Sequence, residues 1–131
     1  MSDDAAAAVI KRINALQHEL VDEISKAVRI PSVNPKYPGQ VYDEVVGRES
    51  EVAQLVTAIH AEAGAETDVF AIEPGRDNAV GVVRGTGGGR SLVYNGHMDV
   101  VPEGNPDSWT DDPFSGARKD GRIWGRGASD M

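Results

Sequence analysis

Two side chains with metal-site chemistry lie two residues apart in the second half of the sequence. His97 and Asp99 follow Asn95-Gly96, which ends a predicted strand over 91–94. In extended backbone both side chains leave the same face, at the sheet edge where ligands bind in open α/β folds. An imidazole nitrogen can bind a metal ion while the carboxylate orients the ring or engages bound water. The alternative is that His97 and Asp99 simply end a strand at the surface and bind no metal. A pattern of only two residues is weak by itself.

A second carboxylate, Asp130, follows the glycine-rich stretch Gly125-Arg126-Gly127. Glycines allow positive φ angles and close backbone packing, which can bring Asp130 into the same pocket as His97. The two oxygens of one carboxylate can each bind a cation, as in metal pairs spaced about 3.5 to 4 Å apart. The alternative is a glycine loop that opens a helix, with Ser129 or Asp130 as its N-cap.

Three longer segments, two of which contain His97, Asp99 and Asp130, resemble a known family in their order and spacing. They resemble the di-zinc hydrolases of acetylornithine deacetylase, succinyl-diaminopimelate desuccinylase, aminoacylase and glutamate carboxypeptidase type, in metallopeptidase clan MH. A softer match, Val28-Arg-Ile-Pro-Ser-Val-Asn-Pro35 after a long helix, extends the resemblance over nearly the whole chain. The three segments are Leu92-Val-Tyr-Asn-Gly-His97-Met-Asp99-Val-Val-Pro102, Trp109-Thr-Asp-Asp-Pro-Phe114 and Asp120-Gly-Arg-Ile-Trp-Gly-Arg-Gly-Ala-Ser-Asp130-Met131.

The resemblance implies roles for three residues. His97 is then a ligand of one metal ion, Asp130 the carboxylate that bridges two, and Asp99 the catalytic residue that supports His97. The implied cofactor is zinc, two ions per complete site, with cobalt or manganese able to replace it. In the family a glutamate general base, further ligands and a lid domain that often forms the dimer follow later in the sequence.

The implied activity is metal-dependent hydrolysis of an amide bond in an N-acyl amino acid, of the acetylornithine deacetylase or succinyl-diaminopimelate desuccinylase kind. We expect this activity of a full-length, homodimeric protein, and we expect the 131-residue chain to be inactive alone. The alternatives are a metallo-dipeptidase or carboxypeptidase of the same family, acting on peptides, and a truncated, non-catalytic remnant that serves as an interaction module.

Composition narrows the range of partners and compartments. A net charge of −8 argues against nucleic-acid and anionic-membrane partners, which require clustered Lys and Arg. The sequence has no cysteine, which excludes thiolate zinc sites and fits a reducing compartment. It starts without a secretory signal and has no apolar stretch of transmembrane length, so we expect a cytoplasmic protein.

The elements that must position these residues are two helices followed by short strands. A helical period predicts a first helix over 3–29, which Ser2 or Asp3 can cap, and a second helix over 48–63. Runs rich in β-formers predict strands over 67–72, 79–84 and 91–94, and a two-residue turn predicts a hairpin around 117–124. The expected fold class is α/β: residues 1–131 form the amino-terminal part of a zinc-exopeptidase-like catalytic domain, a sheet covered by helices.

Two other residues near the predicted site have open roles. Arg126 can brace the metal loop by pairing with a carboxylate, or it can face water. Trp109 can line a substrate cleft or pack beneath a long loop.

Overall fold

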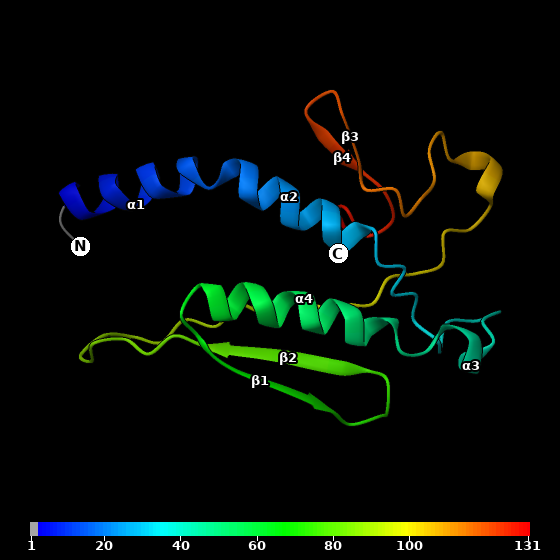
Figure 1. Cartoon of the computed structure of the whole chain (residues 1–131), viewed down its shortest axis with the longest axis horizontal. Helices are drawn as coiled ribbons and strands as arrows, with labels where there is room; N and C mark the ends of the chain where they lie inside the picture. Colours follow the sequence, from blue (N-terminus) through cyan, green and yellow to red (C-terminus); the bar gives the residue numbers. More distant parts are fainter. Residues whose placement is uncertain (1–2) are drawn as a thin grey trace.

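The computed structural model describes residues 3–131, and it begins with two consecutive helices (Figure 1). The predicted helix over 3–29 is divided at Leu16 into α1 (Asp3–Ala15) and α2 (Gln17–Val28). The N–H of Leu16 is shared between the carbonyls of Arg12 and Ile13, 3.1 Å from each, so the chain tightens for one turn there. Ser2, one of the two predicted caps, lies outside the described residues.

The second layer is a helix over a hairpin, and its helix and both strands overlap elements that the sequence predicted. Helix α4 (Arg48–Glu62) ends at Gly64, whose φ of +80° suits a residue without a side chain. Strands β1 (Glu66–Ala71) and β2 (Asp77–Val82) pair antiparallel, and α4 packs along the hairpin (Figure 1). A short helix that the sequence did not predict, α3 (Tyr42–Val45), lies in the connection before α4.

The predicted strand over 91–94 is wrong. This segment makes no ladder with β2 or with any other described strand, and its apolar side chains are exposed. Leu92, Val93 and Tyr94 are 74, 82 and 88% exposed. β-forming residues make a strand only when they pair with a neighbouring strand, and no described strand pairs with this segment. The α/β class of helices and short strands is confirmed, but the strands form two separate two-stranded sheets.

The predicted second hairpin is confirmed and packs against α2. Strands β3 (Ala117–Lys119) and β4 (Arg122–Trp124) are joined by Asp120 and Gly121, both with positive φ, as a two-residue hairpin turn requires. The hydroxyl of Ser25 in α2, which is fully buried, donates to the carbonyl of Gly116 just before β3, at 2.7 Å. A single 3₁₀ turn, η1 (Pro106–Ser108), lies in the loop that precedes this hairpin.

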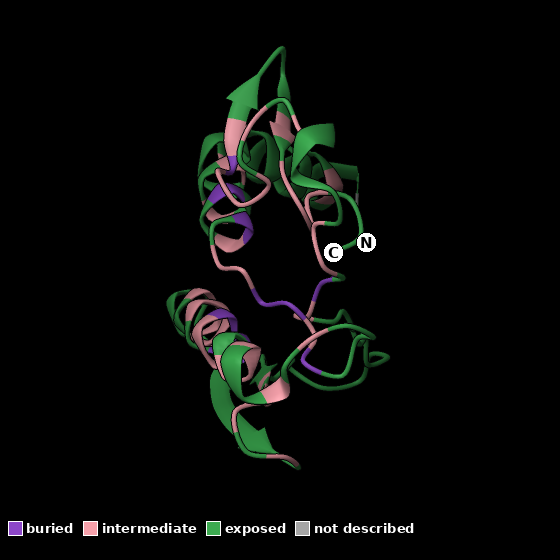
Figure 2. Cartoon of the chain, turned by 90° about the vertical axis from the view of Figure 1, so that its right-hand side faces the viewer, coloured by how far each residue is buried: buried purple, intermediate pink, exposed green. Residues whose placement is uncertain are grey.

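A parallel bridge between Val33 and Val100 joins the two parts of the molecule. The N–H of Asn34 donates to the carbonyl of Val100, and the N–H of Val100 donates to the carbonyl of Ser32, each at 2.9 Å. Val33 and Val100 are 7% exposed and Ser32 only 3%, and Figure 2 shows this buried stretch between the two parts. The bridge fixes the backbone that follows His97.

Much apolar surface outside this junction stays uncovered by the described residues. The apolar stripe of α1 and α2 is largely exposed, and only Val28 at its carboxyl end is buried. On α4, Val52 is buried, whereas Leu55, Val56 and Ile59 are half-buried. Among residues 3–131, no helix is both long and apolar enough to cross a membrane.

Candidate metal centre

The structure brings His97 and Asp130 into contact, although 33 residues separate them in the sequence. The Nε2 atom of His97 lies 3.2 Å from Oδ1 of Asp130. His97 is 51% exposed and the Asp130 side chain 93% exposed, so the contact lies at the surface of the described chain.

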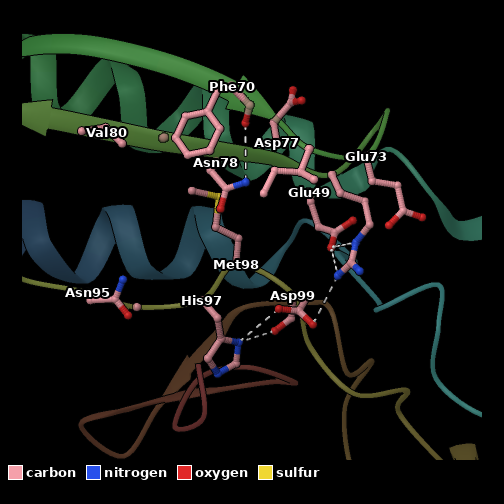
Figure 3. Close-up of a pocket in the computed structure, with 14 residues that line it drawn as sticks. Glu49, Phe70, Glu73, Asp77, Asn78, Val80, Asn95, His97, Met98 and Asp99 are labelled. Carbon is pink, nitrogen blue, oxygen red and sulfur yellow. Dashed lines mark hydrogen bonds and ion pairs between the residues drawn. The ribbon is translucent and has the colours of Figure 1, made fainter.

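The other ring nitrogen of His97 is held by the backbone of Asp99. Nδ1 lies 2.8 Å from the carbonyl oxygen of Asp99 and 3.5 Å from its carboxylate Oδ1 (Figure 3). A carbonyl oxygen only accepts hydrogen bonds, so Nδ1 must carry the hydrogen. This bond raises the pKa of His97 above its usual value, and the nearby Asp130 carboxylate raises it further. Sequence reasoning assigned the support of the ring to the Asp99 carboxylate, whereas the direct contact comes from the Asp99 backbone.

The carboxylate of Asp99 is held from its other side by two residues that the sequence analysis missed. The Nδ2 atom of Asn34 donates to Asp99 Oδ2 at 2.7 Å, and Nη2 of Arg76 lies 3.8 Å from the same oxygen. Arg76 in turn donates from Nε to Oε1 of Glu49 at 2.8 Å. Asn34 belongs to the segment that carried the softer family match, but nothing in the sequence pairs Arg76 or Glu49 with Asp99.

Two glycines place the loop that carries Asp130. Gly125 and Gly127 have φ angles of +152° and +84°, within the range that L side chains rarely adopt. A Cβ atom on Gly127 would lie 2.8 Å from Cγ1 of Val100, and one on Gly125 would overlap Val28. The glycine loop therefore lies close against the side chain of Val100, three residues after His97.

Arg126 and Trp109 contact each other. The guanidinium of Arg126 lies 5.2 Å from the centre of the Trp109 ring and donates from Nη2 to the Glu103 carbonyl at 3.2 Å. Trp109 donates from Nε1 to the same carbonyl at 2.9 Å. Within the described part of the chain, Arg126 forms no ion pair with a carboxylate.

Two cavities meet at His97 and Asp99. The larger, about 460 Å³, extends from these residues toward the turn end of the β1–β2 hairpin, where Arg76 and Asn78 line it (Figure 3). The smaller, about 310 Å³, includes Asp130 and lies on the side of Asn34 and Arg126. The candidate centre is therefore open to small molecules from two sides.

The donor atoms of His97 and Asp130 fit a divalent cation. With the hydrogen on Nδ1, a neutral His97 presents a lone pair at Nε2 toward a carboxylate oxygen, so a proton or a metal ion must separate the two. Zinc binds imidazole nitrogen and carboxylate oxygen at about 2.0 to 2.2 Å, which a 3.2 Å separation of the donors permits. Among residues 3–131, no group of three or more His, Asp or Glu side chains could hold a metal ion, so these two atoms form part of a site.

Comparison with known proteins matches this region to a family. The model of peptidase family M20/M25/M40 matches residues 93–131, the stretch that holds His97, Asp99 and Asp130. Residues 93–131 of the chain are therefore similar to this peptidase family.

Three similar proteins carry the same name. The chain is 38% identical over 118 residues to a succinyl-diaminopimelate desuccinylase of Methylocella silvestris, an alignment that covers 88% of the chain and 27% of that protein. It is 60% identical over 47 residues to the enzyme of that name from Paracoccus denitrificans, covering 36% of the chain and 12% of the relative. The corresponding protein of Paracidovorax citrulli is 56% identical over 48 residues, covering 34% and 12%. The chain thus spans about a quarter or less of the length of these relatives.

Proposed function

We propose that this chain is the amino-terminal part of the catalytic domain of a metal-dependent amidohydrolase. The contact between His97 Nε2 and Asp130 Oδ1, within the region that matches the family model, carries the proposal. The substrate class that we favour is an N-acyl amino acid with a succinyl group, because the three relatives described above are named desuccinylases. N-acetylated amino acids and dipeptides are the competing classes.

In this proposal His97 and Asp130 hold a metal ion, and the family is typically zinc-dependent. When bound, zinc polarises a substrate carbonyl and lowers the pKa of water toward about 7. The chain contributes a fixed imidazole: the Nδ1–H bond to the Asp99 carbonyl keeps the Nε2 lone pair directed at the metal position. Asp130 contributes a carboxylate whose second oxygen has no bonding partner in the described part of the chain, as the bridging role that the family resemblance assigns to it requires.

The remaining parts of the proposal concern the whole protein. Further metal ligands, the general base and a lid or dimerisation domain would come from residues outside this chain, in a homodimer. We expect the 131-residue polypeptide by itself to be inactive, because one imidazole and one carboxylate hold a metal pair too weakly. The cytoplasm stays the predicted compartment.

Substitution of the two proposed ligands tests the function. In the full-length protein, His97→Ala and Asp130→Ala should each lower the zinc content, measured by elemental analysis, and abolish hydrolysis of an N-succinyl amino acid. His18→Ala and Asp68→Ala make the same changes at exposed positions away from the centre and should leave both measurements unchanged. Full zinc occupancy and activity in either ligand variant would overturn the assignment. Parallel assays with N-acetylornithine and dipeptides decide the substrate class.

A further inference from the structure

The Asp99 carboxylate is the end point of a chain of contacts that crosses the molecule. It receives a hydrogen bond from Asn34, in the loop after α2, and faces Arg76, in the turn between β1 and β2. Arg76 is anchored by Glu49, in the first turn of α4. Asn34 and Arg76 both contact the same oxygen, Oδ2. This leaves Oδ1 on the side of His97 (Figure 3).

Asn34 is held in one orientation by its own contacts. Its side-chain Oδ1 accepts a hydrogen bond from the backbone N–H of Lys36 at 2.8 Å, so the amide nitrogen must be the atom that points at Asp99. Its backbone N–H is bonded to the carbonyl of Val100, the residue after Asp99. Asn34 therefore binds the metal-site segment through both its backbone and its side chain.

The ion pair between Arg76 and Glu49 is anchored in the interior. Glu49 is 4% exposed, and its Oε1 accepts from Nε and Nη2 of Arg76 at 2.8 and 2.7 Å. The hydrogen bond to Glu49 raises the pKa of Arg76 above its usual value, so the guanidinium stays charged beside Asp99. At 3.8 Å its attraction for Asp99 is weaker than the hydrogen bond from Asn34.

We propose that Asn34 is a positioning residue of the metal centre, with Arg76 in a secondary part. By holding Oδ2 of Asp99, they keep this carboxylate from rotating onto the imidazole, so that the Nδ1–H of His97 stays on the Asp99 carbonyl and Nε2 stays directed at Asp130. The proposal rests on the proposed function, in which His97 and Asp130 are ligands. It adds residues that touch neither metal nor substrate and act through Asp99.

The variant Asn34→Asp isolates this contact. It has nearly the same shape and keeps the oxygen that accepts from Lys36, but it replaces the donor to Asp99 with a negatively charged acceptor. The two carboxylates would then repel each other across 2.7 Å, and Asp99 would turn toward His97. Loss of a partner that orients a metal ligand typically weakens metal binding about 10- to 100-fold, and we expect a loss in that range.

Asn78→Asp is the matched control. Asn78 lines the larger cavity beside Asp99, and its substitution by Asp adds the same negative charge. The side chain of Asn78, however, makes a 3.5 Å hydrogen bond to the Phe70 carbonyl and not to Asp99. The double variant Glu49→Gln/Arg76→Gln is the second test, because it removes the pull of Arg76 without leaving a buried charge unpaired. It should weaken zinc binding less than Asn34→Asp.

Three measurements on the full-length protein decide the proposal. They are the zinc dissociation constant from competition titration, the visible spectrum of the cobalt-substituted protein, and the tautomer of His97 in the metal-free protein, from long-range ¹H–¹⁵N correlation spectra at alkaline pH. We expect Asn34→Asp to bind zinc at least tenfold more weakly, to change the cobalt spectrum and to lose the pure Nδ1–H tautomer. Its melting temperature should stay close to that of Asn78→Asp.

Zinc affinity and tautomer equal to those of Asn78→Asp would overturn the inference. If Asn34→Asp fails to fold, Asn34→Ser, which lacks the amide donor, tests Asn34 in its place. An unchanged zinc affinity and His97 tautomer in the double variant Glu49→Gln/Arg76→Gln would overturn the secondary role of Arg76. If the unsubstituted protein binds no zinc, the proposed function fails, whereas the tautomer in the metal-free protein still decides whether Asn34 positions His97.

Discussion

Gly127 offers a quantitative test of how the Asp130 loop is placed. Gly127→Ala adds a methyl group at a φ of +84°, where alanine is disfavoured by about 1 to 2 kcal/mol. That Cβ would lie 2.8 Å from Cγ1 of Val100, well inside the 3.4 to 4 Å of ordinary contact. Relieving such overlap in a packed region costs about 1 to 3 kcal/mol more. We therefore expect a total loss of about 2 to 5 kcal/mol in the free energy of unfolding.

Gly64→Ala separates the two contributions. Gly64 has nearly the same φ, +80°, but a Cβ there would meet nothing within 4 Å. It should show the backbone contribution alone, so Gly127→Ala should be the more destabilising by about 1 to 3 kcal/mol. Urea titrations followed by circular dichroism measure both differences.

A double-mutant cycle then identifies the contact. Val100→Ala removes the methyl group that the new Cβ would overlap, so the double variant with Gly127→Ala should be more stable than the sum of the single effects, by about 0.5 to 3 kcal/mol. Strict additivity, or equal losses for Gly127→Ala and Gly64→Ala, would refute the close approach of this loop to Val100.

Three further predictions concern stability and association. Ser25→Ala should cost about 1 to 3 kcal/mol in urea titrations, because it leaves the Gly116 carbonyl without its buried donor; a loss below that range contradicts the bond. Hydrogen bonds from Lys36 and Tyr42 lower the pKa of Glu73 below its usual 4.5, so its stabilisation is present above pH 4.5 and is lost as the pH falls through the lower folded-state pKa. Glu73→Gln should flatten this acid loss in melting temperature against pH, and an unchanged profile would exclude Glu73 as its source. The isolated 131-residue chain should self-associate and bind a hydrophobic dye, because α1 and the segment after β2 expose apolar side chains; a monodisperse monomer in light scattering would contradict this.

The sequence predicted those parts of the structure that depend on local chemistry. The helix over 48–63 has a helical apolar period and a glycine at its end, and the turn at Asp120-Gly121 needs only the positive φ that those two residues tolerate. The juxtaposition of His97 and Asp130 followed from glycines at fixed positions and from the family resemblance.

The errors concern features that depend on distant partners. The segment over 91–94 has the composition of a strand but pairs with none of the described strands. The ion pair of Glu49 with Arg76 joins residues 27 apart on different elements, and no spacing rule connects either of them with Asp99. The first helix is divided at Leu16, but no proline or glycine lies there that would have predicted the break, and no described contact explains it.

The buried residues of this chain serve the candidate metal centre as much as its stability. Val28, Val33 and Val100 are three of the five buried apolar residues within 3–131, and all three lie where the segment after His97 meets the loop that carries Asp130. Val33 and Val100 form the bridge that fixes one backbone, while Gly125 and Gly127 press the other against Val28 and Val100. A change in this small core therefore alters the distance between His97 and Asp130 directly. Substitutions there should affect metal affinity together with stability, whereas substitutions at Ala53 in α4 should affect stability first.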